Sequence, residues 1–408
     1  MNPQMPLTLT IGLLSLSTLT AMAAAPGPAA ARTPDSTRAT AGSAANAPGS
    51  AANAPGSATT AAREITAPAA PRLALPEPTG RRPVGAASLH LVDSSRRDPW
   101  VPASASRELM VSLWYPAKKP AGPRARYVTP EESALILKGV PGVEGTPPDT
   151  VSKTRTHARV DAPPLPSEKG LPLVVMSPGF SFPRATLTSL GEDLASRGYL
   201  VAAVEHTYES VGTTFPDGRT TTCVACEGPM TKEKGEKVAG IRVADLSFVL
   251  DRLTADGRWS RLIDQSKIAM VGHSMGGNSA AQVMLADGRV KAGVNLDGTF
   301  LPTVGELTRP FLMIGTESGH SPGGKDTSWD ESWRRLGGPK QWLTVAGTDH
   351  SSFTDYAVLR EQLGISPTVI KGTRAVEITR AYVAAFLDRR LRHQPVRELH
   401  YTEVKSWK

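Results

Sequence analysis

Short apolar runs alternate with segments of helical periodicity along the chain from about residue 80 onward. Runs such as 171–176 and 199–204 are continuously apolar, which predicts strands that are buried on both faces. Segments such as 187–196 space their apolar residues three and four positions apart, which predicts helices with one buried face. The predicted strands are 89–92, 109–115, 171–176, 199–204, 268–271, 290–296, 310–314 and 342–345, and the predicted helices are 187–196, 237–253, 275–285 and 375–391.

This alternation of strands and helices indicates the fold class. Strands that are separated by helices pair in parallel through right-handed crossovers, so helices cover both faces of the sheet. No second linker interrupts the pattern, and the sequence therefore predicts one α/β domain with a mostly parallel central sheet over residues 80–408.

The segment before this domain has a different character. Residues 11–25 form a short apolar run that ends in small residues, with an A-x-A pattern at 21–23, so we predict a signal peptide over residues 1–23. Residues 24–78 are rich in Ala, Pro, Gly and Ser, and the sequence of 42–48 recurs at 49–55. Such a composition buries too little apolar area to offset its ordering entropy, which predicts a disordered linker. We therefore expect a secreted, extracellular protein.

Composition narrows the class of protein further. The 408 residues are 40% hydrophobic and 21% charged, which is typical of a globular chain and excludes a collagen or a coiled coil. The net charge of +8 is compatible with contact at lipid surfaces, but no aromatic-basic motif indicates nucleic-acid binding. The two cysteines, Cys223 and Cys226, lack a second pair that could complete a metal site. In a secreted protein this spacing favours a local disulfide.

A serine stands at the junction between a predicted strand and a predicted helix. Residues 272–276 read Gly-His-Ser-Met-Gly, which fits the G-x-S-x-G pattern of a nucleophile elbow. The sharp turn of this motif lifts the hydroxyl to the edge of the sheet, where the helix N-terminus favours developing negative charge. We predict Ser274 as the catalytic nucleophile; the alternative is a tight turn that happens to contain serine.

The general base is sought among the downstream histidines, because the partners of such a serine follow in the order Asp/Glu, then His. His393 and His400 lie among charged residues in or after the last helix, where we expect them to be solvated. His320 lies in a segment that reads as a flexible loop and is the weaker candidate. His350 follows the strand 342–345 at the edge where such sheets carry active sites, and is the predicted base.

Two carboxylates compete for the role of the acid. Asp297 follows the strand 290–296 and precedes a glycine, whereas Glu317 follows the next strand. An aspartate at the end of a strand is well placed to hold an imidazole in one tautomer and to stabilise the imidazolium. We predict Asp297, although a turn or helix-capping role would explain the same residue.

The oxyanion hole requires two backbone N–H groups. One is expected from Met275, the residue after the nucleophile, and the other from Phe180, in the loop after the strand 171–176. Gly179 would let this loop turn so that the Phe180 amide faces the site. Glu205 and His206 end a neighbouring strand and are expected to support the loop.

Several segments share their residues with one enzyme family, namely 177–180, 193–199, 201–206, 272–277, 295–298 and 349–355. They resemble the plasma platelet-activating factor acetylhydrolase family, also called lipoprotein-associated phospholipase, which has secreted bacterial relatives. The resemblance covers roughly residues 85–390. It implies an α/β-hydrolase fold with a single catalytic domain and a serine esterase mechanism that needs no cofactor or metal.

The resemblance also implies a set of site residues, which agrees with the one chosen from the sequence pattern: Ser274 as nucleophile, Asp297 as acid, His350 as base, and Phe180 and Met275 as oxyanion donors. It thereby favours Asp297 over Glu317. The sequence departs from the animal enzymes at Pro178, where they have histidine, and in lacking recognisable lipoprotein-docking helices. Lipoprotein association is therefore not implied.

Three functions follow as hypotheses. The first is a secreted serine esterase that removes short acyl groups from phospholipids. The second is a secreted lipase or cutinase-like polyester hydrolase, because Gly-His-Ser-Met-Gly-Gly and Pro-Gly-Phe also resemble those enzymes. Such enzymes usually place the acid after the following strand, where only Glu317 stands. The third is a catalytically silent binding protein, against which the complete triad in the correct order argues.

Overall fold

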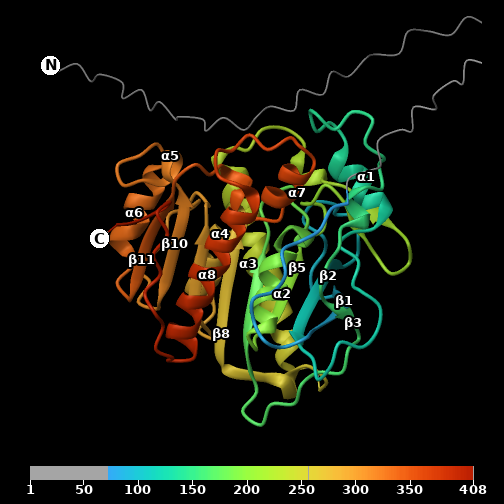
Figure 1. The fold of residues 1–408 in the computed structure, drawn as a ribbon, viewed down its shortest axis with the longest axis horizontal. Coiled ribbons are helices and arrows are strands. Elements are labelled where there is room, and N and C mark those ends of the chain that lie inside the picture. The colour runs from blue at the N-terminus through green and yellow to red at the C-terminus, as the bar shows by residue number, and fades with distance from the viewer. Residues whose placement is uncertain (1–71, 256, 408) are drawn as a thin grey trace, which may run out of the picture. The chain divides into compact units, whose positions relative to one another are not determined.

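The computed structural model describes residues 72–255 and 257–407. Its main feature is a ten-stranded sheet in the order β12-β11-β10-β9-β8-β4-β5-β2-β1-β3 (Figure 1). The strands from β5 to β11 in this order are parallel, whereas β2 and β12 run antiparallel to their inner neighbours. This mostly parallel sheet with interleaved helices confirms the predicted α/β class.

The strands of the main sheet follow the predicted apolar runs and add short edges. The bounds are β1 Val84–Asp93, β2 Arg107–Pro116, β3 Arg159–Val160, β4 Leu171–Ser177, β5 Leu200–Glu205, β8 Ile263–His273, β9 Val290–Leu296, β10 Phe311–Thr316, β11 Lys340–Val345 and β12 Val404–Trp407. A separate small sheet consists of β6 Thr213–Thr214 and β7 Thr220–Thr221.

The helices lie on both faces of the sheet. Their bounds are α1 Pro130–Leu137, α2 Thr188–Ser196, α3 Lys232–Ala255, α4 Met275–Ala286, α5 Glu317–His320, α6 Thr327–Arg335, α7 Tyr356–Gln362 and α8 Gly372–Leu391. Five short 3-10 turns complete the described elements: Val151–Lys153, Arg184–Leu187, Val224–Cys226, Ser260–Leu262 and His350–Phe353.

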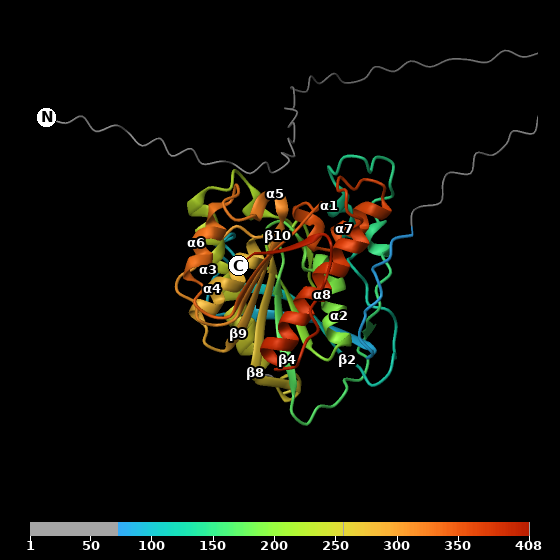
Figure 2. The ribbon, with the colours of Figure 1, turned by 60° about the vertical axis from the view of Figure 1, so that its left-hand side comes forward.

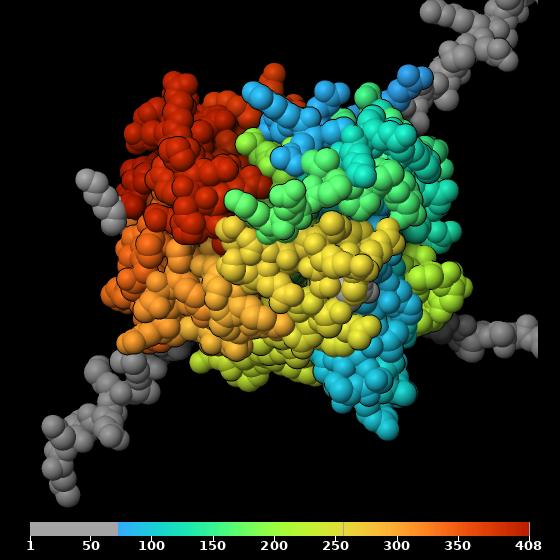
Figure 3. All heavy atoms as spheres, turned by 90° about the horizontal axis from the view of Figure 1, so that it is seen from below, coloured from blue at the N-terminus to red at the C-terminus, as the bar shows by residue number. Residues whose placement is uncertain are grey.

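Two apolar cores form because alternate residues of each buried strand point to opposite faces. Leu173 and Val175 of β4 pack with α3 and α4, whereas Val174 and Met176 pack with α2 and α8. Figure 2 shows α3, α4 and α6 on one side of the sheet and α2 and α8 on the other. Figure 3 shows the molecule from below, at the end of the sheet where β8 begins. Middle segments of the chain, in yellow and orange, and the C-terminal part, in red, cover much of this face.

The packed chain begins earlier than the sequence indicated. The linker was predicted to extend to residue 78, yet Leu73 and Leu75 are only 2% and 3% exposed, in an apolar cluster with Tyr127 and Val128. The Leu75 N–H also donates to the Arg155 carbonyl, and the Arg155 N–H donates to the Leu73 carbonyl. Two buried leucines in a polar segment form too short a pattern to be recognised. The predicted signal peptide and the rest of the linker lie outside the described residues.

The two cysteines are joined. Cys223 and Cys226 form a disulfide with a Cα–Cα distance of 5.2 Å, in the loop that leads from β7 to α3. A link between residues three positions apart closes a very small loop, so it restricts the local turn rather than the whole fold.

Candidate active site

Ser274 occupies a strained turn between β8 and α4. Its φ of 55° and ψ of −124° lie in a region that costs a non-glycine residue about 1–3 kcal/mol. The surrounding glycines make the turn sterically feasible, because a Cβ on Gly272 would collide with the Gly276 carbonyl and one on Gly276 with the Ser177 carbonyl. The sequence pattern therefore indicated the local geometry correctly.

Asp297 and His350 meet beside this turn. Asp297 lies after β9 and His350 begins the turn after β11, and His350 Nδ1 is 2.7 Å from Asp297 Oδ2. Burial raises the pKa of Asp297. The charge of His320 and the hydrogen bonds that Asp297 accepts from His320 and His350 outweigh burial and hold the pKa of Asp297 well below its usual value. A carboxylate is an acceptor only, so His350 Nδ1 carries the proton and Nε2 is left as a base.

Backbone contacts tie the three loops together. The Ser274 N–H donates to the Leu296 carbonyl at 2.8 Å, one residue before Asp297. His273 Nε2 donates to the His350 carbonyl at 2.7 Å, and the two imidazole rings are 4.6 Å apart. Burial lowers the pKa of His273 to about 3, so this ring stays neutral and acts as a spacer. The structure thus brings Ser274, Asp297 and His350 to one edge of the sheet.

The Ser274 hydroxyl itself has no hydrogen-bond partner within the described part of the chain. The His350 side chain is 51% exposed, whereas the Asp297 side chain is 2% exposed. Ser274, which is half-buried, and His350 are therefore accessible from outside, whereas the Asp297 carboxylate is shielded from water.

The loop after β4 passes directly against Ser274. A Cβ on Gly179 would stand 3.3 Å from Ser274 Cβ and 2.8 Å from His273 Nδ1. The glycine is thus required by close approach rather than by an unusual φ, which differs from the reason given by the sequence. The following amide, that of Phe180, has no acceptor among the described residues, as is also true of the Met275 amide at the start of α4.

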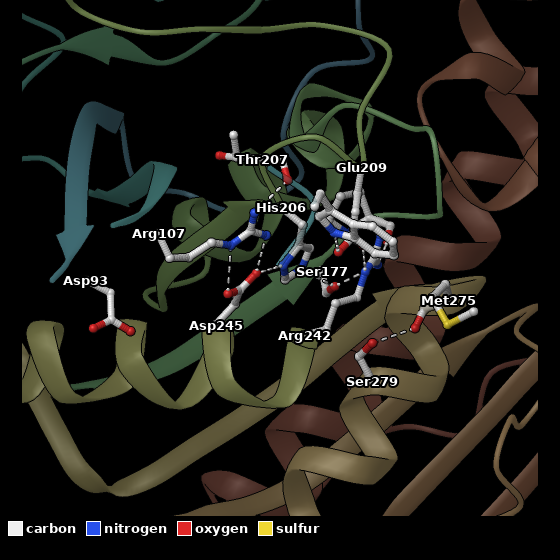
Figure 4. A network of polar contacts seen from close by, with 12 residues as sticks. Asp93, Arg107, Ser177, His206, Thr207, Glu209, Arg242, Asp245, Met275 and Ser279 are labelled. Carbon is white, nitrogen blue, oxygen red and sulfur yellow. Dashed lines mark hydrogen bonds and ion pairs between the residues drawn. The ribbon is translucent and has the colours of Figure 1, made fainter. Parts of the chain in front are cut away.

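Arg242 of α3 fixes the orientation of this loop (Figure 4). Its buried guanidinium donates to the Pro178 carbonyl at 2.6 Å and to the Gly179 carbonyl at 3.5 Å. In a trans peptide the C=O and the next N–H point in opposite directions. Because Arg242 holds the Gly179 carbonyl on one side, the Phe180 N–H points to the other. An ion pair with Glu209 at 2.7 Å keeps the arginine in place.

A second set of buried contacts extends from the same loop (Figure 4). His206 Nε2 is 2.9 Å from Ser177 Oγ, and its Nδ1 is 2.9 Å from Asp245. Asp245 also pairs with Arg107 at 2.8 Å. Burial raises the pKa of Asp245, but Arg107 and His206 outweigh that effect and keep it ionised. His206 thus contacts the loop as the sequence suggested, whereas Glu205 pairs with Arg184 instead.

The surroundings of His320 differ from the flexible loop that the sequence predicted. His320 ends α5 and is only 4% exposed. Its Nδ1 is 2.7 Å from Asp297 Oδ1, so Asp297 contacts two imidazoles. No local pattern predicts this contact, because it depends on how the segment after β10 folds back over the sheet edge. Glu317, the competing acid, is exposed.

No group of three or more His, Cys, Asp or Glu side chains among residues 72–255 and 257–407 is arranged to hold a metal ion. Within the same ranges, no helix combines the length and the apolar character that crossing a bilayer requires.

Comparisons with known proteins agree with this geometry. Residues 101–225 and 231–397 match the family described as platelet-activating factor acetylhydrolase, isoform II. The chain is 26% identical over 353 residues to a probable 1-alkyl-2-acetylglycerophosphocholine esterase of Arthroderma benhamiae, covering 76% of this chain and 87% of the relative. It is 27% identical over 284 residues to the platelet-activating factor acetylhydrolase of Cavia porcellus, covering 60% and 63%.

A solved structure is more similar in sequence. The ferulic acid esterase from Streptomyces cinnamoneus is 41% identical, with a TM-score of 0.73, and the match covers 83% of this chain and all of that chain. A shorter match of 149 residues, 27% identical, links the chain to cutinase est1 of Thermobifida alba and covers 35% and 41%. The esterase neighbour confirms the α/β-hydrolase fold.

Proposed function

Because the chain belongs to the platelet-activating factor acetylhydrolase isoform II family of carboxylic ester hydrolases, we propose that it is a secreted serine esterase that hydrolyses short acyl esters of phospholipids. The observation that carries the catalytic part is the 2.7 Å contact between Asp297 and His350 beside the strained turn of Ser274. The phospholipid part rests on the names of the relatives.

Acylation uses the residues in the following roles. Ser274 Oγ attacks the acyl carbonyl carbon while His350 Nε2 accepts the serine proton and Asp297 stabilises the resulting imidazolium. The N–H groups of Phe180 and Met275 bind the oxyanion of the tetrahedral intermediate. The intermediate then collapses, the C–O bond to the alcohol breaks, and His350 returns the proton to the departing oxygen.

Deacylation repeats these steps with water. His350 takes a proton from the attacking water, the acyl group leaves Ser274 as a free acid, and the serine regains its proton. Each turnover consumes one water and returns the serine and the histidine to their starting protonation states. The catalytic roles of all five residues are proposals that rest on the geometry described above.

A second candidate is the hydrolysis of esters of aromatic acids. The ferulic acid esterase is more similar in sequence to this chain than the relatives from Arthroderma benhamiae and Cavia porcellus, with 41% against 26% and 27% identity. Aromatic side chains also gather near the nucleophile: the ring of Phe182 lies 5.3 Å from that of His273 and 4.9 Å from that of Tyr356. Such a surface suits a planar acyl group.

The cutinase-like alternative is supported by a shorter match only. Three substrates tested side by side distinguish the candidates: a phospholipid with a 2-acetyl group, methyl ferulate, and an aliphatic polyester film. The phospholipid proposal expects the highest kcat/KM for the acetyl phospholipid. A clear preference for methyl ferulate, or release of soluble products from the film, would replace it with the corresponding alternative.

The nucleophile is tested separately from the substrate. Ser274→Ala is expected to reduce hydrolysis of every active substrate by about 10⁴-fold or more while leaving the melting temperature unchanged. Ser266→Ala removes an exposed hydroxyl elsewhere on β8 and serves as the control, with unchanged activity. Substantial turnover by the Ser274 variant would assign the chemistry to another residue.

Secretion remains part of the proposal. It is supported by the predicted leader over residues 1–23 and by the Cys223–Cys226 disulfide, which is typical of oxidising compartments. Expression of the full chain in a secreting host, followed by N-terminal sequencing of the protein in the medium, tests it. Retention of the uncleaved chain inside the cells would contradict it.

A further inference from the structure

His320 lies between two carboxylates. Its Nδ1 is 2.7 Å from Asp297 Oδ1, and its Nε2 is 3.1 Å from Asp326 Oδ2, at the start of α6. The side chain is 5% exposed, and the two aspartates are 2% and 4% exposed. The cluster is therefore shielded from water, yet it adjoins the proposed catalytic carboxylate.

The geometry determines the charge of this imidazole. An ionised carboxylate accepts hydrogen bonds but cannot donate them, so each ring nitrogen needs its own proton to satisfy its partner. Only the imidazolium form provides both N–H groups. The electrostatics agree: burial lowers the pKa of His320, but Asp297 and Asp326 outweigh it and raise the value to about 9.

Neighbouring residues hold the ring in place. Trp329 of α6 stacks on it with a centroid distance of 4.2 Å, which suits a cation, and the Trp342 indole N–H donates to the His320 carbonyl at 2.7 Å. On β10, a Cβ at Gly315 would stand 2.9 Å from both His320 Nδ1 and Asp297 Oδ1. The bare glycine thus leaves room for this contact.

The titratable groups that face His320 are few. They are Asp297 from the end of β9, Asp326 from the start of α6 and, across Asp297, His350 from the turn after β11. From β10 the Thr316 N–H, which is not titratable, donates to the same Asp297 oxygen at 2.6 Å. Glu317, on the same short helix, is exposed. The carboxylate of Asp297 is consequently shared between one buried and one accessible imidazole.

We propose that His320 is a positioning residue that stays protonated in the working enzyme and holds Asp297 in the position in which this carboxylate orients His350. The inference rests on the proposed serine mechanism. One imidazolium N–H is donated to Asp326 and anchors the ring, and the other is donated to Asp297 Oδ1. Asp297 Oδ2 is thereby kept in contact with His350 Nδ1.

This arrangement predicts the alkaline limb of the pH profile. In the unmodified protein, His320 itself loses a proton above about pH 9, and one of its two carboxylates then loses its donor. Asp297 is held less firmly in that state, so the alkaline limb should depend on His320.

The experiment follows the rate at which a fluorophosphonate probe labels Ser274 between pH 4 and pH 10 in the full chain. His320→Gln keeps a neutral donor of similar length but no charge. We expect its alkaline limb to disappear, because the group that loses its proton near pH 9 is absent. Asp326→Asn, which retains the cap of α6, should move the alkaline limb to lower pH. His400→Gln, at an exposed histidine, is the matched control and should reproduce the unmodified profile.

The outcomes separate the inference from the mechanism on which it rests. An unmodified protein that is not labelled at any pH would contradict the serine mechanism itself. Labelling of His320→Gln that is uniformly slower but has an unchanged alkaline limb would show a structural role only and overturn the inference. If His320→Gln does not fold, as judged by its melting temperature, the direction of the Asp326→Asn shift decides: an unchanged alkaline limb would overturn the inference.

Discussion

At the scale of single residues, the site depends on two strained backbones. Ser274 and Asp297 both have φ values near +55°, a conformation that non-glycine residues rarely adopt. The sequence predicted the turn at Ser274 because its glycines form a recognisable motif. It predicted Asp297 by its place after a strand and by the family resemblance, and it could not show that the same carboxylate also contacts His320.

The choice between the two candidate acids can be tested directly. Asp297→Asn should lower kcat by about 10³–10⁴-fold at neutral pH, because an amide can hold His350 in the wrong tautomer. Glu317→Gln should change kcat by less than about threefold, since this side chain is exposed and does not contact His350. Steady-state kinetics at matched melting temperature provides the comparison. A disabled Glu317 variant beside an active Asp297 variant would reverse the assignment.

His320 also links stability to pH. Its folded-state pKa, about 9, exceeds the ordinary value of 6.5, so the folded state binds the proton more tightly than the unfolded state. This contribution is fully present below pH 6.5 and is lost as the pH rises through about 9. Thermal unfolding should therefore show a melting temperature that falls over this interval. The fall should be shallower in His320→Gln; an equal slope in both proteins would contradict this linkage.

At the scale of elements, the loop after β4 depends on a helix that is distant in sequence. Arg242 of α3 anchors the carbonyls of Pro178 and Gly179, and this contact sets the direction of the Phe180 amide. The sequence predicted the helix from its apolar stripe and the loop from its glycine. It could not predict their contact, because an arginine on a predicted helix is ordinarily expected to face solvent.

Two glycine-to-alanine variants, one of them a control, test the close approach of this loop to Ser274. Gly179→Ala adds a methyl group 2.8 Å from His273 Nδ1, which displaces the loop from the nucleophile. We expect kcat to fall by about ten- to a thousandfold with a smaller change in KM, since the oxyanion is bound only in the transition state.

The matched control is Gly240→Ala, on α3, where an added methyl group has no neighbour within 4 Å. That variant should keep full activity and gain about 0.5–1 kcal/mol of unfolding free energy, because alanine favours a helix more than glycine does. Equal kcat values for Gly179→Ala and the control would argue against Phe180 as an oxyanion donor.

At the scale of the whole molecule, most of the central sheet was predictable from its continuous apolar runs. The elements that were missed are short and carry no long periodic pattern: the helices α1, α5, α6 and α7 and the strands β3, β6, β7 and β12. The sequence at Val404–Trp407 becomes a strand only by pairing with β11. Tertiary contacts of this kind cannot be inferred from local propensity.

The start of the packed chain gives the corresponding prediction. Deletion of residues 24–71 should leave the melting temperature and the activity nearly unchanged, in keeping with the predicted linker composition. Deletion of residues 24–78 also removes Leu73 and Leu75, and should cost about 3 kcal/mol or more of unfolding free energy. Denaturant unfolding of the two truncated proteins measures the difference, and equal stabilities would contradict the packing of these leucines.

The stacking of His320 on Trp329 has an optical consequence. A protonated imidazole quenches the fluorescence of an indole that it contacts, and these two rings lie 4.2 Å apart and nearly parallel. The emission of Trp329 should therefore brighten as His320 loses its proton, and the Trp329→Phe variant should lack that change. The protein thus carries an intrinsic fluorophore beside its active site, which reports the charge of the buried histidine in the absence of any substrate.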